Sequence, residues 1–367
     1  MSTNQNKINR DSFFMSLALN QAMINLGNTK ENPSVGCVIT KNNSVVSAGY
    51  TSLNGRPHAE FNAINKCKEN LINSNLYVTL EPCSHYGKTP PCVKKIIKSK
   101  VKKVFFSIKD PDLRSYNNSS KILKKKQINV NIGILSNKIS HFYKSYILSK
   151  RNKLPFVTCK LATSKDLFTI NKKKKWITNE YSRGRVHLLR SYNDCLITSA
   201  TTINKDNPRL TCRISGLLSR SPARVILDKN LKINLNSKVI SESLFYKTII
   251  FYNNHTETKI RRLKRFNIKL YKVPLDSSGN IDLNISLFKI KSMGYSRIFL
   301  ESGITLTKAF FDKGLIDDFK LFISDKKIGK NGSGNIGLFL KSILKNKRNY
   351  IEKVNLFGEK LISYQIK

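Results

Sequence analysis

The chain has 367 residues and a formal net charge of +43, with 66 lysines and arginines against 23 aspartates and glutamates. Its length is typical of about two domains, and its 40% share of hydrophobic residues excludes wholesale disorder. It lacks a run of ~18 apolar residues and a secretory signal, and its seven cysteines are odd in number, so we expect a cytoplasmic protein with no membrane partner and no disulfide framework.

The first part of the chain alternates between helices and short strands. Asp11-Ser12 is expected to cap a helix that ends near Gly27. Further helices are predicted at residues 58–69 and 119–126. Strands are predicted at residues 35–39, 45–49, 76–80, 101–108 and 128–132. This alternation predicts a layered α/β domain.

A polar segment at residues 150–153 is the predicted linker to a second α/β pattern. In this half, strands are predicted at residues 156–161, 195–198, 224–227, 248–252, 268–273 and 298–300. Helices are predicted at residues 179–190, 283–293 and 305–313. The four lysines at 172–175 are expected to form a solvated loop. We therefore predict two domains, residues 1–149 and 150–367.

The strongest chemical pattern is a histidine with two cysteines, namely His58, Cys83 and Cys92. An imidazole and two thiolates fill three positions of a tetrahedral zinc site and leave the fourth for water. Zinc lowers the pKa of such a water towards ~7. Glu60 follows His58 by two residues at a helix start, so it can lie beside the metal and transfer the proton of the water.

A closed structural zinc site is the alternative interpretation of these ligands. It needs a fourth ligand, and Cys37 and Cys67 are the nearby thiols in the sequence. Cys37 is expected inside a strand and Cys67 in a helix, so both are better explained as small buried residues. The sequence thus favours a catalytic site with an open position.

Three blocks carry a resemblance to a known family. They are Asn32-Pro33-Ser34-Val35-Gly36-Cys37-Val38, Gly55-Arg56-Pro57-His58-Ala59-Glu60, and residues 79–92, TLEPCSHYGKTPPC. The His-x-Glu and Pro-Cys elements are typical of zinc-dependent deaminases, although eight residues rather than two separate the cysteines here. Together the blocks closely resemble the deaminase half of the bifunctional riboflavin-biosynthesis deaminase/reductase. The resemblance implies a cytidine-deaminase-like α/β/α layer domain with one zinc ion per chain.

The resemblance also implies the deaminase substrate, a small phosphorylated pyrimidine: a diaminopyrimidinone that carries a ribosylamine phosphate. The positions that match substrate contacts are Asn32, His85, Lys88 and Asp110. Two departures lie close to this set. Thr51 stands where the family usually has histidine, and Asp112-Leu113 stands where it usually has Asn-Pro. We expect them to alter substrate affinity rather than abolish the reaction.

Resemblance to the same family continues through the second half. The matching blocks are residues 160–166 (KLATSKD), 176–178 (WIT), 200–211 (ATTINKDNPRLT) and 301–306 (ESGITL). They imply an α/β domain similar to dihydrofolate reductase that uses NADPH to reduce the ribosyl group to a ribityl chain. Gly303 is expected to open a helix whose N-terminus suits phosphates. The chain has no Gly-x-Gly-x-x-Gly, which argues against a Rossmann fingerprint.

Site positions in the reductase half follow from this resemblance. The cofactor-binding positions are Ala162, Trp176, Thr202, Asp206, Gly303, Ile304, Thr305, Leu306, Thr307, Lys308 and Ala309. The substrate-binding positions are Lys174, Arg190, Leu210, Arg213 and Glu301. Lys174 stands where serine is usual, and Lys229 stands where serine or another small residue is usual. Leu167 and Ser302 replace glycines. The added side chains of Leu167 and Ser302 are expected to crowd the backbone near the cofactor.

Three alternative functions stay open at this point. They are a deaminase with an inactive reductase half, a nucleoside or RNA deaminase with an appended binding domain, and a scaffold or RNA-binding module without activity. The net charge favours a nucleic-acid partner. However, the lysines are scattered among many Asn and Ile residues, and all three have AT-rich codons. Base-composition bias is therefore the better explanation, so no nucleic-acid partner is expected, and homo-oligomerisation is left open.

Overall fold

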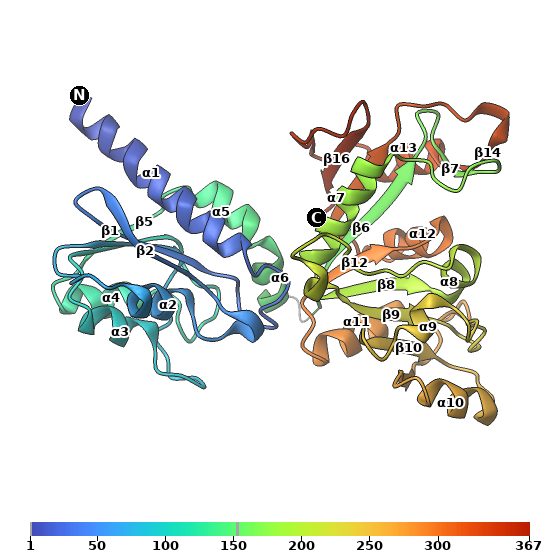
Figure 1. Cartoon of the computed structure of the whole chain (residues 1–367), viewed down its shortest axis with the longest axis horizontal. Helices are drawn as coiled ribbons and strands as arrows, with labels where there is room; N and C mark the ends of the chain where they lie inside the picture. The colour runs from blue at the N-terminus through green and yellow to red at the C-terminus, as the bar shows by residue number, and fades with distance from the viewer. Residues whose placement is uncertain (1, 152–153) are drawn as a thin grey trace. The chain divides into compact units, whose positions relative to one another are not determined.

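The computed structural model describes residues 2–151 and 154–367. Its internal contacts divide the chain into two compact units, residues 1–153 and 154–367. Each unit is a layered α/β structure (Figure 1), as the alternation of predicted helices and strands implies. Within the described residues, no helix combines the length and the apolar character that a bilayer span requires.

The first unit is built on one five-stranded sheet with the order β2-β1-β3-β4-β5. The strands are β1 (Gly36–Lys41), β2 (Ser44–Tyr50), β3 (Asn75–Leu80), β4 (Lys103–Ile108) and β5 (Asn129–Ile132). The helices are α1 (Ser2–Met23), α2 (Ala59–Lys66), α3 (Cys92–Lys98), α4 (Asn118–Lys125), α5 (Ser136–Phe142) and α6 (Lys144–Arg151), with the 3-10 turn η1 (Leu53–Gly55). β1 pairs antiparallel with β2 and β3, whereas β3, β4 and β5 are parallel.

Helices cover both faces of this sheet. α1 and α5 lie on one face, and α2, α3 and α4 lie on the other (Figure 1). Two glycines let helices approach the strands closely. A Cβ atom on Gly36 would lie 1.9 Å from the carbonyl oxygen of Ala18 in α1, and one on Gly49 would lie 2.5 Å from that of Ala59 in α2. The predicted α/β/α layering is confirmed.

The second unit contains a nine-stranded sheet in the order β11-β10-β9-β8-β12-β6-β13-β16-β15 and a two-stranded sheet, β14-β7. Its strands are β6 (Phe156–Thr163), β7 (Phe168–Asn171), β8 (Cys195–Ser199), β9 (Ala223–Leu227), β10 (Thr248–Tyr252), β11 (Lys269–Lys272), β12 (Arg297–Glu301), β13 (Asp318–Ile323), β14 (Gly332–Asn335), β15 (Asn349–Ile351) and β16 (Lys360–Gln365). Its helices are α7 (Glu180–Ser191), α8 (Ala200–Asp206), α9 (Lys238–Ser241), α10 (Glu257–Lys264), α11 (Leu283–Ser292), α12 (Ile304–Asp312) and α13 (Gly337–Leu344), with the turns η2 (Leu218–Arg220) and η3 (Gly329–Asn331).

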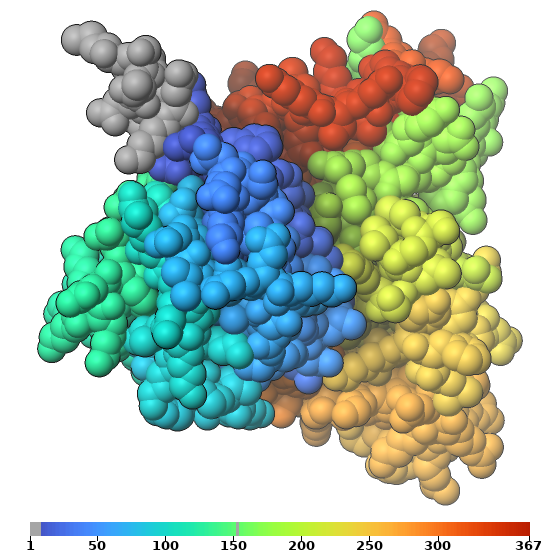
Figure 2. Space-filling model, turned by 60° about the vertical axis from the view of Figure 1, so that its left-hand side comes forward, coloured from blue at the N-terminus to red at the C-terminus, as the bar shows by residue number. Residues whose placement is uncertain are grey.

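The large sheet separates two hydrophobic clusters. One contains residues of α11, α12 and α13, such as Leu287 and Phe310, and the other contains residues of α7 to α10, such as Leu189 and Leu263. Seven neighbouring strands of this sheet are parallel, in the order β11-β10-β9-β8-β12-β6-β13. The carboxyl ends of β6, β8, β9 and β12 therefore lie at one edge of the sheet. In Figure 2 the yellow and orange segments, which include α10, form a continuous part of the surface of this unit.

Several local predictions differ from the structure. The helix predicted to start at Asp11-Ser12 begins at Ser2 instead, and the Asp11 carboxylate accepts a hydrogen bond from the Tyr77 hydroxyl at 2.7 Å. Helix α6 extends to Arg151 into the predicted linker, whose residues 152 and 153 lie outside the described ones. The sequence also gave no prediction for the elements α3, α5, α6, α8, α9, α10, α13, β7, β13, β14, β15 and β16. All of these span eight residues or fewer, which is too short for a clear hydrophobic period.

Candidate active sites

The first candidate site lies where the end of β3 meets the starts of α2 and α3. His58 is the N-cap of α2, Cys83 follows β3, and Cys92 is the first residue of α3. The Nδ1 atom of His58 lies 3.5 Å from the Sγ atom of Cys83 and 3.4 Å from that of Cys92. The three ligand atoms all lie within 4.8 Å of one another. The fold therefore brings residues 34 positions apart within reach of one metal ion.

The chemistry of this group fits zinc. One imidazole nitrogen and two sulfurs are ligands that catalytic zinc sites use. The hydrogen bond with Cys92 lowers the pKa of the Cys83 thiol, and so do the contacts with His58, which favours the thiolate that a metal binds. Among the described residues, no fourth His, Cys, Asp or Glu joins the group. Cys37 lies in the hydrophobic core, and the Cys67 thiol points to backbone carbonyls. A zinc ion held by these three ligands would have its fourth position available for water.

Glu60 lies next to this group in the first turn of α2 and is 3% exposed. Burial raises the pKa of its carboxyl to about 7, and the charge of Cys83 acts in the same direction. His58 and the Cys92 thiol act in the opposite direction. A carboxyl with such a pKa is able both to accept and to donate a proton near neutral pH.

Two of the predicted substrate contacts lie on loops next to the ligands. The Nδ2 atom of Asn32 donates to the carbonyl of Gly55 at 3.2 Å, in the segment that leads to the histidine ligand. Gly55 has a φ of +89°, and a Cβ atom there would lie 2.4 Å from the Asn32 amide, so glycine is required for this close approach. Lys88 is exposed on the loop between the two cysteine ligands.

Glu81 connects the other two predicted contacts, His85 and Asp110. Its carboxylate is 2% exposed and accepts hydrogen bonds at 2.7–3.2 Å from the backbone N–H groups of Asp110, Asn117 and Ser119 and from the Ser119 hydroxyl. The same loop carries Ser115, whose hydroxyl lies 2.9 Å from Nδ1 of His85. Glu81 therefore fixes the loop that presents Asp110. Glu81 was not among the site residues predicted from the sequence. Its position as an acidic residue between a buried strand and a cysteine ligand was the feature that could have indicated it.

The two departures in this half take part in hydrogen bonds. Thr51 is 1% exposed, and its hydroxyl accepts the N–H of Val35 at 2.9 Å. Asp112 accepts hydrogen bonds from the side chains of Arg114 at 2.6 Å and Lys150 at 3.1 Å. Thr51 thus holds the backbone at Val35, and Asp112 holds the side chains of Arg114 and Lys150.

The second candidate site centres on an ion pair between Arg190 of α7 and Glu301 at the end of β12. The pair is bidentate, with N–O distances of 2.9 and 2.8 Å, and Arg190 also donates to the carbonyl of Thr211 at 2.9 Å. Burial alone would raise the pKa of Glu301, but the charges of Arg190 and Lys160 lower it to about 2. Lys160 is the register partner of Glu301 across β6 and β12. We did not predict Lys160 as a site residue, although a lysine within an apolar strand was the available signal.

The remaining predicted substrate contacts differ in their surroundings. The backbone N–H of Arg213 lies 3.3 Å from Nδ1 of His187, and burial together with the charges of Arg190 and Arg213 lowers the pKa of that histidine to about 4. Leu210 is 2% exposed and packs in the cluster formed by α7 to α10. Lys174 is exposed on the turn after β7. The role of these residues as substrate contacts stays a prediction.

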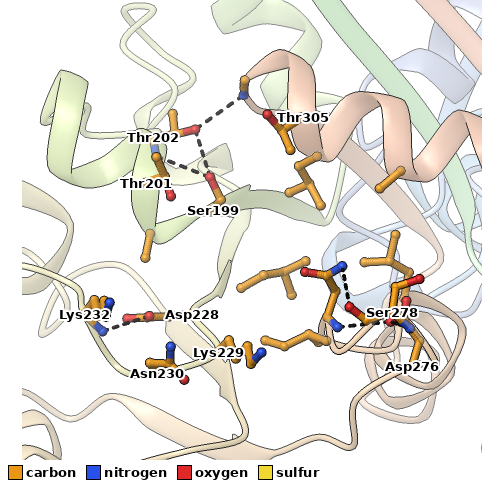
Figure 3. A pocket seen from close by; sticks show the side chains of 18 of the residues that line it. Ser199, Thr201, Thr202, Asp228, Lys229, Asn230, Lys232, Asp276, Ser278 and Thr305 are labelled. Atoms are coloured by element: carbon orange, nitrogen blue, oxygen red, sulfur yellow. Dashed lines mark hydrogen bonds between the residues drawn. The ribbon is translucent and has the colours of Figure 1, made fainter.

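A cavity of about 1110 Å³ opens at the carboxyl ends of β8, β9 and β12. Figure 3 shows Ser199 and Thr202 on one side of it. The Oγ1 atom of Thr202 lies 3.1 Å from Oγ of Ser199 and accepts the N–H of Gly303, the N-cap of α12, at 3.4 Å. The predicted cofactor positions that line this cavity are Thr202, Gly303, Thr305, Leu306 and Ala309.

The other predicted cofactor positions do not line this cavity; they are Ala162, Trp176, Asp206, Ile304, Thr307 and Lys308. Thr307 is fully buried, and the Nζ atom of Lys308 lies 5.4 Å from the ring centre of Phe339. Trp176 is 57% exposed, and the guanidinium of Arg183 lies 5.1 Å from its ring centre.

The two glycine replacements are accommodated. Leu167 keeps the left-handed backbone with a φ of +65°, and its side chain packs on the cluster of α11 to α13. The Oγ atom of Ser302 lies 3.3 Å from Oγ1 of Thr307. The turn that glycine would favour is therefore retained with a leucine in it.

Comparisons with known proteins agree with these two sites. Residues 8–108 match the cytidine and deoxycytidylate deaminase zinc-binding region, and residues 155–355 match the RibD C-terminal domain. The riboflavin biosynthesis protein RibD of Aquifex aeolicus is 31% identical over 357 residues, which are 96% of this chain and 98% of the relative. The chain belongs to the RibD family. The family resemblance noted in the sequence is confirmed.

Further RibD proteins support this assignment. The Escherichia coli protein is 29% identical over 341 residues, which cover 89% of this chain and 90% of the relative. The crystal structure of a diaminohydroxyphosphoribosylaminopyrimidine deaminase/5-amino-6-(5-phosphoribosylamino)uracil reductase from Thermotoga maritima is 29% identical, has a TM-score of 0.82, and covers 98% of this chain and 99% of that chain. As a RibD family member, this chain is a bifunctional riboflavin biosynthesis enzyme with a deaminase half and a reductase half.

Proposed function

We propose that the first unit deaminates a diaminohydroxyphosphoribosylaminopyrimidine and that the second unit reduces the resulting 5-amino-6-(5-phosphoribosylamino)uracil with NADPH. The name of the Thermotoga maritima relative contains both substrates. The observation that carries the proposal is the group of His58, Cys83 and Cys92 next to the buried carboxyl of Glu60. In the second unit, the Arg190–Glu301 pair supports it.

In the deaminase half, one carboxyl moves the protons. His58, Cys83 and Cys92 would hold one zinc ion, which supplies Lewis acidity to a water in the open position when it is bound. The Glu60 carboxylate accepts a proton from the attacking water and returns it to the departing amino group, so that ammonia leaves. Burial keeps bulk water away from this carboxyl and holds its pKa near the pH at which both transfers are feasible.

The substrate of the deaminase half is held by groups on the surrounding loops. Lys88 provides a positive charge for the phosphate, and His85 provides a hydrogen-bond donor. Asn32 and Asp110 bind polar groups of the ring or the sugar. The hydrogen bonds that Glu81 accepts keep the loop of Asp110 in place for this contact.

In the reductase half, arginine side chains bind the substrate, and the start of α12 binds NADPH. NADPH would supply a hydride when it is bound. The N–H groups in the first turn of α12 and the hydroxyl of Thr202 bind its pyrophosphate. Arg213 and Arg190 bind the substrate phosphate, and Glu301 fixes the orientation of Arg190. The hydride adds to C1 of the opened ribosylamine and a proton adds to the attached nitrogen, which yields the ribityl chain.

The test is a reaction with the full chain loaded with zinc, followed by mass spectrometry of the pyrimidine. Without NADPH, we expect ammonia release and an increase in mass of about 1 Da; with NADPH, we expect a further increase of about 2 Da. The Glu60→Gln variant should retain zinc by elemental analysis and lose at least about 100-fold in ammonia release. The matched control, Glu69→Gln at an exposed position, should not change the rate. A zinc-loaded chain that releases no ammonia at saturating substrate would contradict the deaminase proposal.

A further inference from the structure

We propose that Arg224, near the start of β9, is a positioning residue for the reductase substrate, because it holds the loop that carries Arg213. The inference rests on the proposed reductase function and deepens it, since the family resemblance assigns no role to this arginine. We call residues 207–213, which follow α8, the substrate loop. Leu210 and Arg213 are the predicted substrate contacts in this loop.

Arg224 is a charged side chain that is 0% exposed. Its guanidinium donates to the carbonyls of Val239 and Tyr246, both at 3.0 Å, and to the hydroxyl of Thr248 at 2.7 Å. Val239 belongs to α9, and the other two acceptors lie at the start of β10. Burial lowers the pKa of Arg224 to about 10, so the group is still charged at neutral pH. The surrounding scaffold therefore holds a buried cation in one orientation.

The substrate loop is attached to this buried cation in two ways. Nη1 of Arg224 donates to the backbone carbonyl of Arg209 at 3.1 Å. Glu242 supplies the second link, because its carboxylate lies 2.8 Å from the Arg209 guanidinium and 4.0 Å from Nη1 of Arg224. The main chain of Arg209 is thus bound to Arg224 directly, and its side chain is bound through Glu242.

The next two residues carry this constraint to a substrate-binding arginine. Leu210 has a φ of +58°, a left-handed conformation that leucine rarely adopts, and its side chain is 2% exposed. Such a turn persists only where the structure on both sides holds it. The carbonyl of Thr211 then accepts a hydrogen bond from Arg190 at 2.9 Å. The position of the Arg209 carbonyl therefore affects where Arg190 points.

Three arginines lie close together at the end of the substrate loop. Burial lowers the pKa of Arg213, and the charges of Arg190 and Arg209 act in the same direction. Glu301 and Glu242 act in the opposite direction, but each forms its ion pair with another arginine, Arg190 and Arg209 respectively. Like charges repel, so the group requires a fixed backbone, and a phosphate relieves the repulsion. The substrate loop thus offers a phosphate site whose geometry depends on Arg224.

A displaced substrate loop should affect binding of the pyrimidine more than the chemical step. The phosphate is remote from the carbon that receives the hydride, so its contacts are equally strong in the ground state and the transition state. Loss of such contacts raises KM and leaves kcat nearly unchanged. The KM of NADPH should not change, because the start of α12 is outside the substrate loop.

The experiment is steady-state kinetics of the full chain with 5-amino-6-(5-phosphoribosylamino)uracil and NADPH. A lysine keeps the charge but cannot bond all four acceptors, so Arg224→Lys should raise the KM of the pyrimidine about tenfold and change kcat less than about twofold. Glu242→Gln keeps the direct bond of Arg224 and should raise the same KM about threefold. The matched control, Arg261→Lys on the exposed face of α10, should change neither constant.

Two results would overturn the inference. One is an unchanged KM of the pyrimidine in Arg224→Lys, and the other is an equal rise in the KM of NADPH, which indicates a general loss of structure. Unfolding temperatures and ammonia release by the first unit identify a misfolded variant. If Arg224→Lys does not fold, Glu242→Gln decides, and an unchanged KM there contradicts the role of the network. A wild type that does not oxidise NADPH removes the reductase proposal itself, and the inference with it.

Discussion

Glu60 and Glu301 are both carboxyl groups in candidate sites, and their neighbours shift their pKa values in opposite directions. Glu60 is buried next to the sulfur of Cys83, so burial and a like charge keep its proton bound up to about pH 7. Glu301 faces Arg190 and Lys160, so nearby positive charge outweighs burial and keeps it ionised. The surroundings of each side chain thus suit one carboxyl for proton transfer and the other for holding a cation.

Glu301 should make stability depend on pH. Its pKa of about 2 in the folded chain lies below the ordinary 4.5, so its contribution is complete above pH 4.5 and is lost as the pH falls towards 2. Glu301→Gln leaves the Arg190 charge buried and should cost about 3 kcal/mol of unfolding free energy at pH 7. Urea denaturation at pH 7, 5, 4 and 3 measures this difference, which should shrink below pH 5. A difference that stays constant down to pH 3 would contradict the stated pKa.

Among the elements, α1 and α2 lie against their sheet without an intervening side chain. Gly36 in β1 and Gly49 in β2 occupy the points of contact. A strand normally gains from a β-branched residue and loses from glycine, so local preference alone would disfavour both positions. The close approach of a helix backbone explains why glycine is present there.

Gly36→Ala should destabilise the first unit. The new methyl group would lie 1.9 Å from the carbonyl oxygen of Ala18 and 2.5 Å from the nitrogen of Ala22, so α1 must move, at a cost of about 3 kcal/mol. Gly184→Ala is the matched control, because nothing lies within 4 Å of that Cβ position in α7. This second change should stabilise its helix by about 0.5–1 kcal/mol. Chemical denaturation measures the free energy of unfolding of both variants. An unchanged free energy of unfolding in Gly36→Ala would refute the packing argument.

On the scale of the whole molecule, each half has its own core and its own site. The hydrophobic cluster of the first unit contains residues between Phe14 and Ile147, and the clusters of the second unit lie between Leu154 and Ile366. His58, Cys83 and Cys92 all belong to the first unit, and the residues that line the cavity all belong to the second. Ligands of the two halves should therefore stabilise different units.

Metal removal should affect the first unit selectively. A metal present at about 100 times its dissociation constant stabilises the folded state by about 2.7 kcal/mol, so a chelator should lower the unfolding temperature of this unit by roughly 5–10 °C. Differential scanning calorimetry of the zinc-loaded chain, with and without chelator, measures the shift. The Gly36→Ala variant identifies the transition of the first unit. In His58→Ala the chelator should cause no shift, and an equal shift in both units would argue against a site confined to the first.

Local chemistry explains what could be predicted from the sequence. His58, Glu60, Cys83 and Cys92 were recognisable because metal ligands and a proton carrier need particular residue types at short spacings, and those types are rare. The continuous apolar runs of buried strands, such as residues 248–252, were likewise visible along the chain. Short helices such as α8 and α9 were not, because four to seven residues hold too few turns for a period.

By itself, the sequence determined the family and the α/β class, and it predicted the zinc ligands and a general base, because these depend on residue identity within short segments. Tertiary structure alone decided which polar side chains meet. Asp11 pairs with Tyr77 instead of capping a helix, Glu81 holds the loop of Asp110, and Lys229 faces Thr202 across a cavity. For the last two, the physical reason is that parallel strands bring their carboxyl ends to one edge of a sheet, where residues 30 to 100 positions apart become neighbours.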